Sequence, residues 1–303
     1  MLTLKKTSKL ITFILVFAAY FYANAGYKQE VGKFNLYSVV EDSLIVNQLA
    51  NFVEQCKAKY NRFFNYTYDQ DVAIYLTSSE QEYKKFNQPS IPAWSSGVAY
   101  TRLRKIILKP GSYYDPERYR ETLFHEIAHM YIADVSNNRL IPGWLNEGIS
   151  MYLSEKNISW QESISIGNAI STGRLVDLIA VDSVLLFLNA EAELAYLESF
   201  LAVQFLISKV GEETVVKIIK DFSSLASIDE IFEKNLGYSY FEFEIEWYDD
   251  LKSRYKWMLM LQFENLFWFS LIFIIFIAFF LKKMRNRRIL REWEEEDYFD
   301  PES

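Results

Sequence analysis

Two histidines lie at a spacing that could hold a metal ion, and a glutamate stands between them in the sequence. Residues 125–129 read HEIAH, with His125 and His129 four positions apart and Glu126 between them. On a helix the two histidines share one face, so both imidazoles can point at one ion. Glu126 can then reach a water molecule on that ion and act as a general base. The chain contains only two histidines, and this motif uses both.

The third ligand must come from another residue type, because a catalytic zinc takes three protein ligands and keeps one position open. The candidates are a carboxylate and, less plausibly, Cys56. Glu147, in the segment PGWLNEGIS, is favoured because the turn signals at 137–143 predict that a second helix returns towards the first. Asp134 is the weaker rival, since it lies off the face that carries the histidines.

A motif of this kind can also arise on an ordinary amphipathic helix, with surface histidines and a solvated Glu147. The flanks of the motif argue against an exposed helix, because its apolar residues lie nearly all round it. Buried histidines need partners, and a metal ion supplies one. The apolar flanking residues are Leu123, Phe124, Ile127, Ala128, Met130 and Tyr131.

The elements that must position these residues are short strands followed mostly by helices. Asp115 and Pro116 predict the start of the metal-site helix, as cap and first helical residue. We expect strands at Asp71–Thr77, Gly97–Thr101 and Lys105–Lys109. We expect the other helices at Glu41 to about Phe63, Ser78–Phe86, Glu193–Val210, Gly211–Phe222, Ile228–Leu236 and Ser239–Tyr255. This order predicts an α+β fold: a small mixed sheet with the active-site helix, then a helical C-terminal subdomain.

The segments HEIAHMY and PGWLNEGIS resemble the gluzincin zinc peptidases, in particular the compact peptidase MA-like group. The resemblance runs from about Asp71 to about Tyr255 and is most specific in these two segments. It implies a zincin-like fold and a zinc cofactor, with Glu126 as the base and His125, His129 and Glu147 as the ligands.

Two positions depart from the pattern of that family. Many gluzincins carry an acid at the position of Met151 that orients a histidine, so this function has no assigned residue here. The segment Gly97–Tyr100 corresponds to a sheet edge that pairs with extended substrate, although an interior strand fits the sequence equally well. It lacks the acid with which zinc aminopeptidases hold a free amino terminus, which argues against aminopeptidase specificity.

The reaction also needs a donor that stabilises the oxyanion, and no histidine remains for it. The resemblance points to Tyr196, in the segment Ala195–Ser199, which matches a tyrosine-bearing helix of the family. Because the chain has 21 tyrosines, a core position for Tyr196 is an equal alternative. Tyr100 and Arg174 are the other candidate donors.

The N-terminal segment 1–25 is typical of a cleaved signal peptide. It has a basic start, an apolar run from Leu10 to Ala23, and a small-residue cleavage site at 23–25. The run is too short for a comfortable membrane span, although an uncleaved anchor remains the alternative.

The C-terminal apolar run predicts a single transmembrane helix at 265–281. From Leu266 to Leu281 only Ser270 is polar, and a basic cluster that begins at Lys282 follows at once. The cluster predicts that the tail, 282–303, is cytoplasmic. A buried core helix is the alternative for the run, and we expect the acidic tail to be disordered.

The composition narrows the function. A net charge of −8 argues against nucleic-acid partners, and the single cysteine, expected to be a packed residue, excludes an intramolecular disulfide. We therefore predict a membrane-anchored zinc metallopeptidase that acts on peptides or proteins, with an extracytoplasmic catalytic domain at 26–260. The alternatives are a zinc-stabilised binding or scaffold protein without activity and a hydrolase of other amides or esters. The sequence leaves the oligomeric state open.

Overall fold

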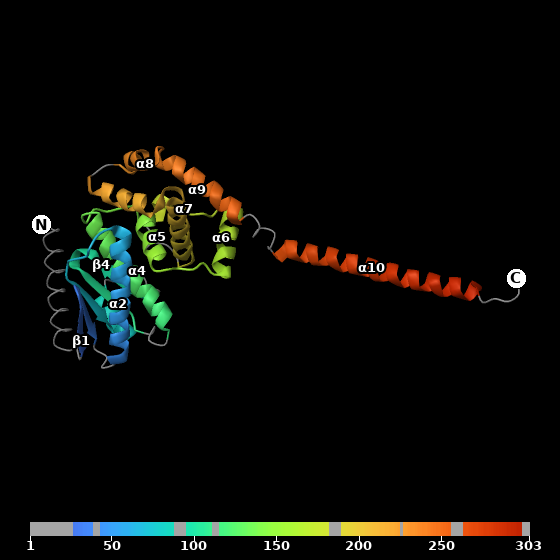
Figure 1. Ribbon diagram of the computed structural model, residues 1–303, viewed down its shortest axis with the longest axis horizontal. Helices are drawn as coiled ribbons and strands as arrows, with labels where there is room; N and C mark the ends of the chain where they lie inside the picture. The colour runs from blue at the N-terminus through green and yellow to red at the C-terminus, as the bar shows by residue number, and fades with distance from the viewer. Residues whose placement is uncertain are drawn as a thin grey trace.

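The computed structural model describes residues 27–38, 43–87, 95–110, 115–181, 189–224, 227–255 and 263–298. The predicted signal segment, 1–25, lies outside the described residues. In Figure 1 the sheet and a group of helices form one body, and a long C-terminal helix follows it.

The five described strands form one mixed sheet in the order β1-β2-β3-β5-β4. The hairpin of β1 and β2 turns at Gly32, whose φ of 63° favours glycine. Strand β3 pairs in parallel with β2 and β5, and β4 runs antiparallel to β5. Strand β4 is therefore an edge, which decides against the interior alternative. The bounds are β1 Tyr27–Val31, β2 Phe34–Ser38, β3 Val72–Leu76, β4 Gly97–Tyr100 and β5 Lys105–Leu108.

Alternating side chains give the sheet two apolar faces. Phe34, Ile74 and Ile106 belong to the main core, which the helices α2 (Ser43–Phe64) and α4 (Pro116–Val135) share. Tyr75 and Ile107 point to the other face, which α3 (Glu80–Phe86) covers. The helix α4 thus lies between the sheet and the helical part.

The metal-site helix has the predicted start. The Asp115 side chain accepts a hydrogen bond from the backbone N–H of Arg118, and Pro116 occupies the first turn. Asn137 and Asn138, with φ of 55° and 56°, then turn the chain. Helix α5 (Gly143–Leu153) begins after Pro142, so the two motif segments lie on neighbouring helices, as predicted.

The C-terminal part of the body is helical. It comprises α6 (Trp160–Thr172), α7 (Asn189–Asp221), α8 (Ile228–Leu236) and α9 (Tyr240–Tyr255). Gly211 interrupts α7 with φ 78° and ψ 162°, close to the predicted helix boundary. Helix α5 packs extensively on α7, and α9 packs on α6 and α8. The mixed sheet followed by helices confirms the predicted α+β class.

Helix α10 (Phe263–Tyr298) follows the body as a separate long helix (Figure 1). The prediction of a disordered tail is wrong for residues 282–298, which continue this helix. Its arginines and glutamates have high helix propensity and can attract one another across a turn. Within α10, Phe267–Arg291 is long and apolar enough to span a membrane, with a mean hydropathy of 2.0. Glu191–Ser224 also passes this test but is largely buried in the body.

Candidate metal centre

Helices α4 and α5 bring three ligand atoms together. His125 Nε2 lies 3.1 Å from His129 Nε2. Glu147 Oε2 lies 3.2 Å from His125 Nε2 and 3.7 Å from His129 Nε2. The helical spacing of four aligns the two imidazoles, and α5 carries the carboxylate to them from the returning chain.

This arrangement fits a zinc ion. Zinc binds nitrogen and carboxylate oxygen at about 2.0–2.2 Å, so tetrahedral ligands lie about 3.3 Å apart. Glu147 Oε2 is buried and accepts no conventional hydrogen bond from the described residues. Among those residues, His125, His129 and Glu147 are the group of side chains that could hold a metal ion.

The other nitrogen of His129 is held by helix α5. His129 Nδ1 lies 3.0 Å from Asn146 Oδ1 and 3.1 Å from Ser150 Oγ. Ser150 Oγ in turn donates to the Asn146 carbonyl oxygen. A proton on Nδ1 satisfies the Asn146 oxygen and leaves the Nε2 lone pair directed at the metal position.

Two carboxylates with different environments face this position. Burial raises the pKa of Glu126 to about 7, and the neighbouring charge of Glu147 acts in the same direction. Burial also acts to raise the pKa of Glu147, but His129 and His125 outweigh it and bring that pKa below its usual value. Burial thus makes Glu126 hold its proton more tightly than Glu147 does.

The described structure brings one of the three candidate oxyanion donors close to both carboxylates. Burial raises the pKa of the Tyr196 phenol far above its usual value, and the charges of Glu147 and Glu126 add to this. Tyr100 donates instead to Asn87, and Arg174 binds the Thr172 hydroxyl at the end of α6.

The rival metal ligands lie elsewhere. Cys56 is buried in the apolar core between α2 and its neighbours, where burial raises the pKa of its thiol. Asp134 pairs with Arg104 at 3.2 Å and accepts a hydrogen bond from Tyr66. The sequence expectation that Cys56 is a packed residue is confirmed.

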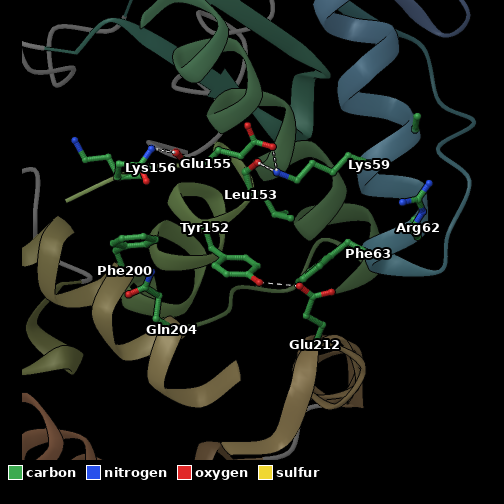
Figure 2. Close-up of a pocket in the computed structure, with 12 residues that line it drawn as sticks. Lys59, Arg62, Phe63, Tyr152, Leu153, Glu155, Lys156, Phe200, Gln204 and Glu212 are labelled. Atoms are coloured by element: carbon green, nitrogen blue, oxygen red, sulfur yellow. Dashed lines mark hydrogen bonds and ion pairs between the residues drawn. The ribbon is translucent and has the colours of Figure 1, made fainter. Parts of the chain in front are cut away.

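Figure 2 shows a hollow of the body whose lining includes none of the three candidate ligands. It has a volume of about 650 Å³ and lies between α2, the end of α5 and α7. Within it Lys59 pairs with Glu155, and Tyr152 donates a hydrogen bond to Glu212. The hollow is lined by Ala58, Lys59, Arg62, Phe63, Tyr152, Leu153, Glu155, Lys156, Asn157, Phe200, Gln204 and Glu212.

The family of the chain follows from a match to the model of the peptidase MA superfamily over residues 54–253. The matched range contains α4, α5 and α7, and with them the three candidate ligands, Glu126 and Tyr196. The chain belongs to the peptidase MA superfamily. A metallopeptidase in general is therefore the activity that the family supports, and a metal ion is the cofactor that it implies.

Two solved structures of leukotriene A4 hydrolase from yeast are similar to this peptidase MA superfamily member. One is in complex with bestatin: it is 15% identical, with a TM-score of 0.37, and the match covers 77% of this chain and 37% of that one. The native enzyme from Saccharomyces cerevisiae is also 15% identical, with a TM-score of 0.38 and coverages of 79% and 38%. The chain thus spans less than half the length of these structures. No curated protein matches it.

Proposed function

We propose that this member of the peptidase MA superfamily is a membrane-anchored zinc metallopeptidase of gluzincin type. The observation that carries the proposal is the convergence of His125 Nε2, His129 Nε2 and Glu147 Oε2 from two helices. The charges of His129 and Glu147 act on the adjacent, buried Glu126. His125, His129 and Glu147 would bind the ion, and Glu126 would act as the general base of the reaction.

Each of these side chains would have a separate function in peptide hydrolysis. A zinc ion bound to the three ligands supplies a Lewis acid for the scissile carbonyl and for water. Glu126 takes the proton of the attacking water and gives it to the leaving amine, for which a pKa of about 7 is suited. The Tyr196 hydroxyl donates a hydrogen bond to the oxyanion. Burial of Glu126 and Tyr196 limits competing water.

The anchor is helix α10. An apolar window followed by Lys282, Lys283 and Arg285 is typical of a single span with its basic end in the cytoplasm. The catalytic body would then lie on the extracytoplasmic side, where a cleaved signal at 1–25 would direct it. Peptides or proteins at that face of the membrane are the expected substrates.

The test of the site uses the full-length chain in detergent, with its zinc content and its cleavage of a mixed peptide library measured together. The wild type should bind one zinc per chain and cleave in a chelator-sensitive manner. Glu126→Gln should keep the zinc and lose at least about 100-fold in kcat, because it keeps the shape of the base but cannot accept the proton. Glu147→Ala should lose zinc as well as activity.

Other outcomes would redirect the proposal. Zinc without cleavage of peptides, esters or amides would favour a scaffold protein whose metal site is structural. Cleavage of esters or other amides alone would favour a hydrolase with a different substrate. Full activity in Glu126→Gln would exclude Glu126 as the base, and unchanged zinc in Glu147→Ala would point to another third ligand.

A further inference from the structure

The edge strand β4 presents its backbone to helix α4. The backbone N–H of Lys109 donates a hydrogen bond to the Ser96 carbonyl oxygen. Because the residues of an antiparallel strand alternate in their bonding to the neighbouring strand, residues 96, 98 and 100 bond to β5. Gly97 and Ala99 therefore direct their backbone N–H and C=O groups away from β5. Helix α4 packs against β4 on this side. The free edge of the sheet therefore faces the helix that carries Glu126.

One of these outward groups acts on Glu126. The Ala99 backbone N–H is directed away from β5, and it favours the ionised form of the Glu126 carboxylate against the effect of burial. Glu126 is only 7% exposed, so few groups other than this N–H can fix the direction of its carboxylate. A hydrogen bond to an ionised and buried acceptor is among the stronger ones in proteins.

Gly97 leaves the space that the Glu126 side chain fills. A Cβ atom at position 97 would lie 2.9 Å from Glu126 Cγ, 3.0 Å from Glu126 Oε1 and 3.0 Å from Thr122 Cγ2. These approaches are closer than ordinary van der Waals contact to the two carbon atoms and the oxygen. Any larger residue at position 97 must therefore move either β4 or the carboxylate of Glu126.

The strand is also held by a contact to α3. Tyr83 and Ser95 share a hydrogen bond of 3.2 Å between their hydroxyl oxygens, and Ser95 Oγ donates to the Gly97 carbonyl oxygen. The backbone that meets Glu126 is thus fixed to the second apolar cluster of the sheet, where Tyr83 is buried.

We propose that Gly97 and Ala99 are positioning residues for Glu126, with the Ala99 N–H setting the direction of its carboxylate and Gly97 leaving room for it. This inference rests on the proposed function, in which Glu126 is the base. It also bears on how β4 can pair with substrate, because the Gly97 carbonyl accepts a hydrogen bond from Ser95 and the Ala99 N–H would be engaged by Glu126.

The deciding variant is Ala99→Pro in the full-length chain, because proline removes the outward N–H without removing a bond to β5. We expect one zinc per chain, a Tm within about 5 °C of the wild type, a roughly 10- to 100-fold lower kcat on a fluorogenic peptide from the library and a KM within about twofold. Gly97→Ala should lower kcat in the same way. Ala99→Gly, which keeps the N–H, should retain kcat within about threefold. In crystal structures, the Glu126 carboxylate should lie within hydrogen-bond distance of the residue 99 nitrogen in the wild type and turn away in Ala99→Pro.

Wild-type kcat and an unmoved Glu126 in Ala99→Pro would overturn the inference. If Ala99→Pro loses zinc or melts early, Gly97→Ala decides by the same kcat and crystal criteria. If the wild type binds zinc but cleaves nothing, the proposed function fails, and the position of Glu126 in the crystals still decides whether β4 sets it.

Discussion

At the scale of single residues, helix α5 both supplies Glu147 and orients one of the histidines. Asn146, directly before Glu147, and Ser150, one turn after it, both contact His129 Nδ1. Many gluzincins would use an acid at position 151, where this chain has Met151. In this chain an amide and a hydroxyl on α5 make the contacts with His129 Nδ1.

We predict that Asn146→Ala weakens zinc binding by roughly 10- to 100-fold, because His129 loses the acceptor that fixes its ring and its tautomer. Asn146→Asp keeps an acceptor at the same place and should bind zinc at least as tightly as the wild type. Competition with a chelator of known affinity measures both variants. An unchanged zinc affinity in Asn146→Ala would leave Ser150 as the orienting group, which Ser150→Ala then tests.

A second buried carboxylate lies on α7, two residues beyond Tyr196. Glu198 is fully buried, and both of its oxygens accept from the backbone N–H of Val176, at 3.1 and 3.0 Å. Burial raises the pKa of Glu198 to about 8, although the Val176 bond acts in the opposite direction. In the unfolded chain a glutamate titrates near pH 4.3, so ionisation of Glu198 opposes folding as the pH rises.

We predict that Glu198→Gln removes part of the pH dependence of stability. Protonated Glu198 makes its full contribution to the free energy of unfolding of the wild type below about pH 4. This contribution is lost as the pH rises towards about 8, and the loss amounts to roughly 3–5 kcal/mol. The Tm of the variant should therefore rise relative to the wild type by about 10 °C between pH 5 and pH 8. Thermal unfolding of both chains at the two pH values measures this, and an equal difference at both would contradict it.

The residues that were predictable from the sequence are those whose geometry is local. His125, Glu126 and His129 follow from the repeat of one helix, and Glu147 follows from a turn and a second helix. Asn146 and Ser150 could not be assigned to His129, because their contact depends on how closely α5 approaches α4. Among 21 tyrosines, only the packing of α7 brings Tyr196 close to the carboxylates.

At the scale of elements, the contact between α5 and α7 depends on Gly148. A Cβ atom at this position would lie 2.6 Å from Val203 Cγ2 and 2.8 Å from the Ser199 carbonyl carbon. A backbone atom cannot move aside as the end of a side chain can. The absence of a side chain at Gly148 therefore lets α5 approach α7, with Glu147 on the adjacent residue.

Gly148→Ala should consequently destabilise the chain by about 1–3 kcal/mol, which lowers the Tm by roughly 3–10 °C, and should weaken zinc binding as α5 shifts. The double variant with Val203→Ala should recover only part of this loss, since Ser199 remains in place. Helix propensity alone predicts the opposite sign, about 1 kcal/mol of stabilisation. A Tm above that of the wild type would therefore show that α5 and α7 are not in close contact.

The elements were most predictable where their ends carry a chemical signal. Asp115 and Pro116 mark the start of α4, and α8 has the predicted bounds, Ile228–Leu236. The hairpin β1–β2 was not predicted, although Gly32 lies at its turn, because its short strands mix charged and apolar residues and gain their stability from pairing with β3. The charge of the acidic tail predicts disorder, but residues 282–298 continue α10 because arginine and glutamate have high helix propensity.

At the scale of the whole molecule, the proposed membrane anchoring by α10 would limit where the metal centre can act. The segment 256–262 joins α9 to α10 and can extend to at most about 25 Å. With α10 in the membrane, the catalytic body would stay within a short reach of the lipid surface. Substrates anchored in the same membrane would then meet it at a raised effective concentration.

The predicted topology can be tested by thiol labelling, since the single native cysteine, Cys56, is buried. A cysteine in place of the exposed Ser253 on α9 should react with a membrane-impermeant maleimide in intact cells. A cysteine in place of the exposed Arg291 should react only after permeabilisation. The reverse pattern would place the catalytic body in the cytoplasm, and labelling of both in intact cells would exclude a spanning α10.

The large-scale organisation followed from the sequence because it depends on composition over long stretches. The apolar run near residue 270 and the motif segments are separated by chain of ordinary composition, so a body followed by a terminal helix could be predicted. The packing of α7 inside the body could not be predicted from the sequence. The hydropathy of α7 also allows a membrane span, and only its burial distinguishes a core helix from a spanning helix.

The pairing of the only two histidines at 3.1 Å gives the molecule a reporter of its own. In a nuclear magnetic resonance spectrum of the chain labelled at histidine, each ring signal would come from this centre, with no background from other positions. The Nε2 and Nδ1 signals of His129 would separate metal binding from the bond to Asn146, because each nitrogen faces one of the two. Metal loading, proton uptake and inhibitor binding could thus be followed on two side chains without adding a probe.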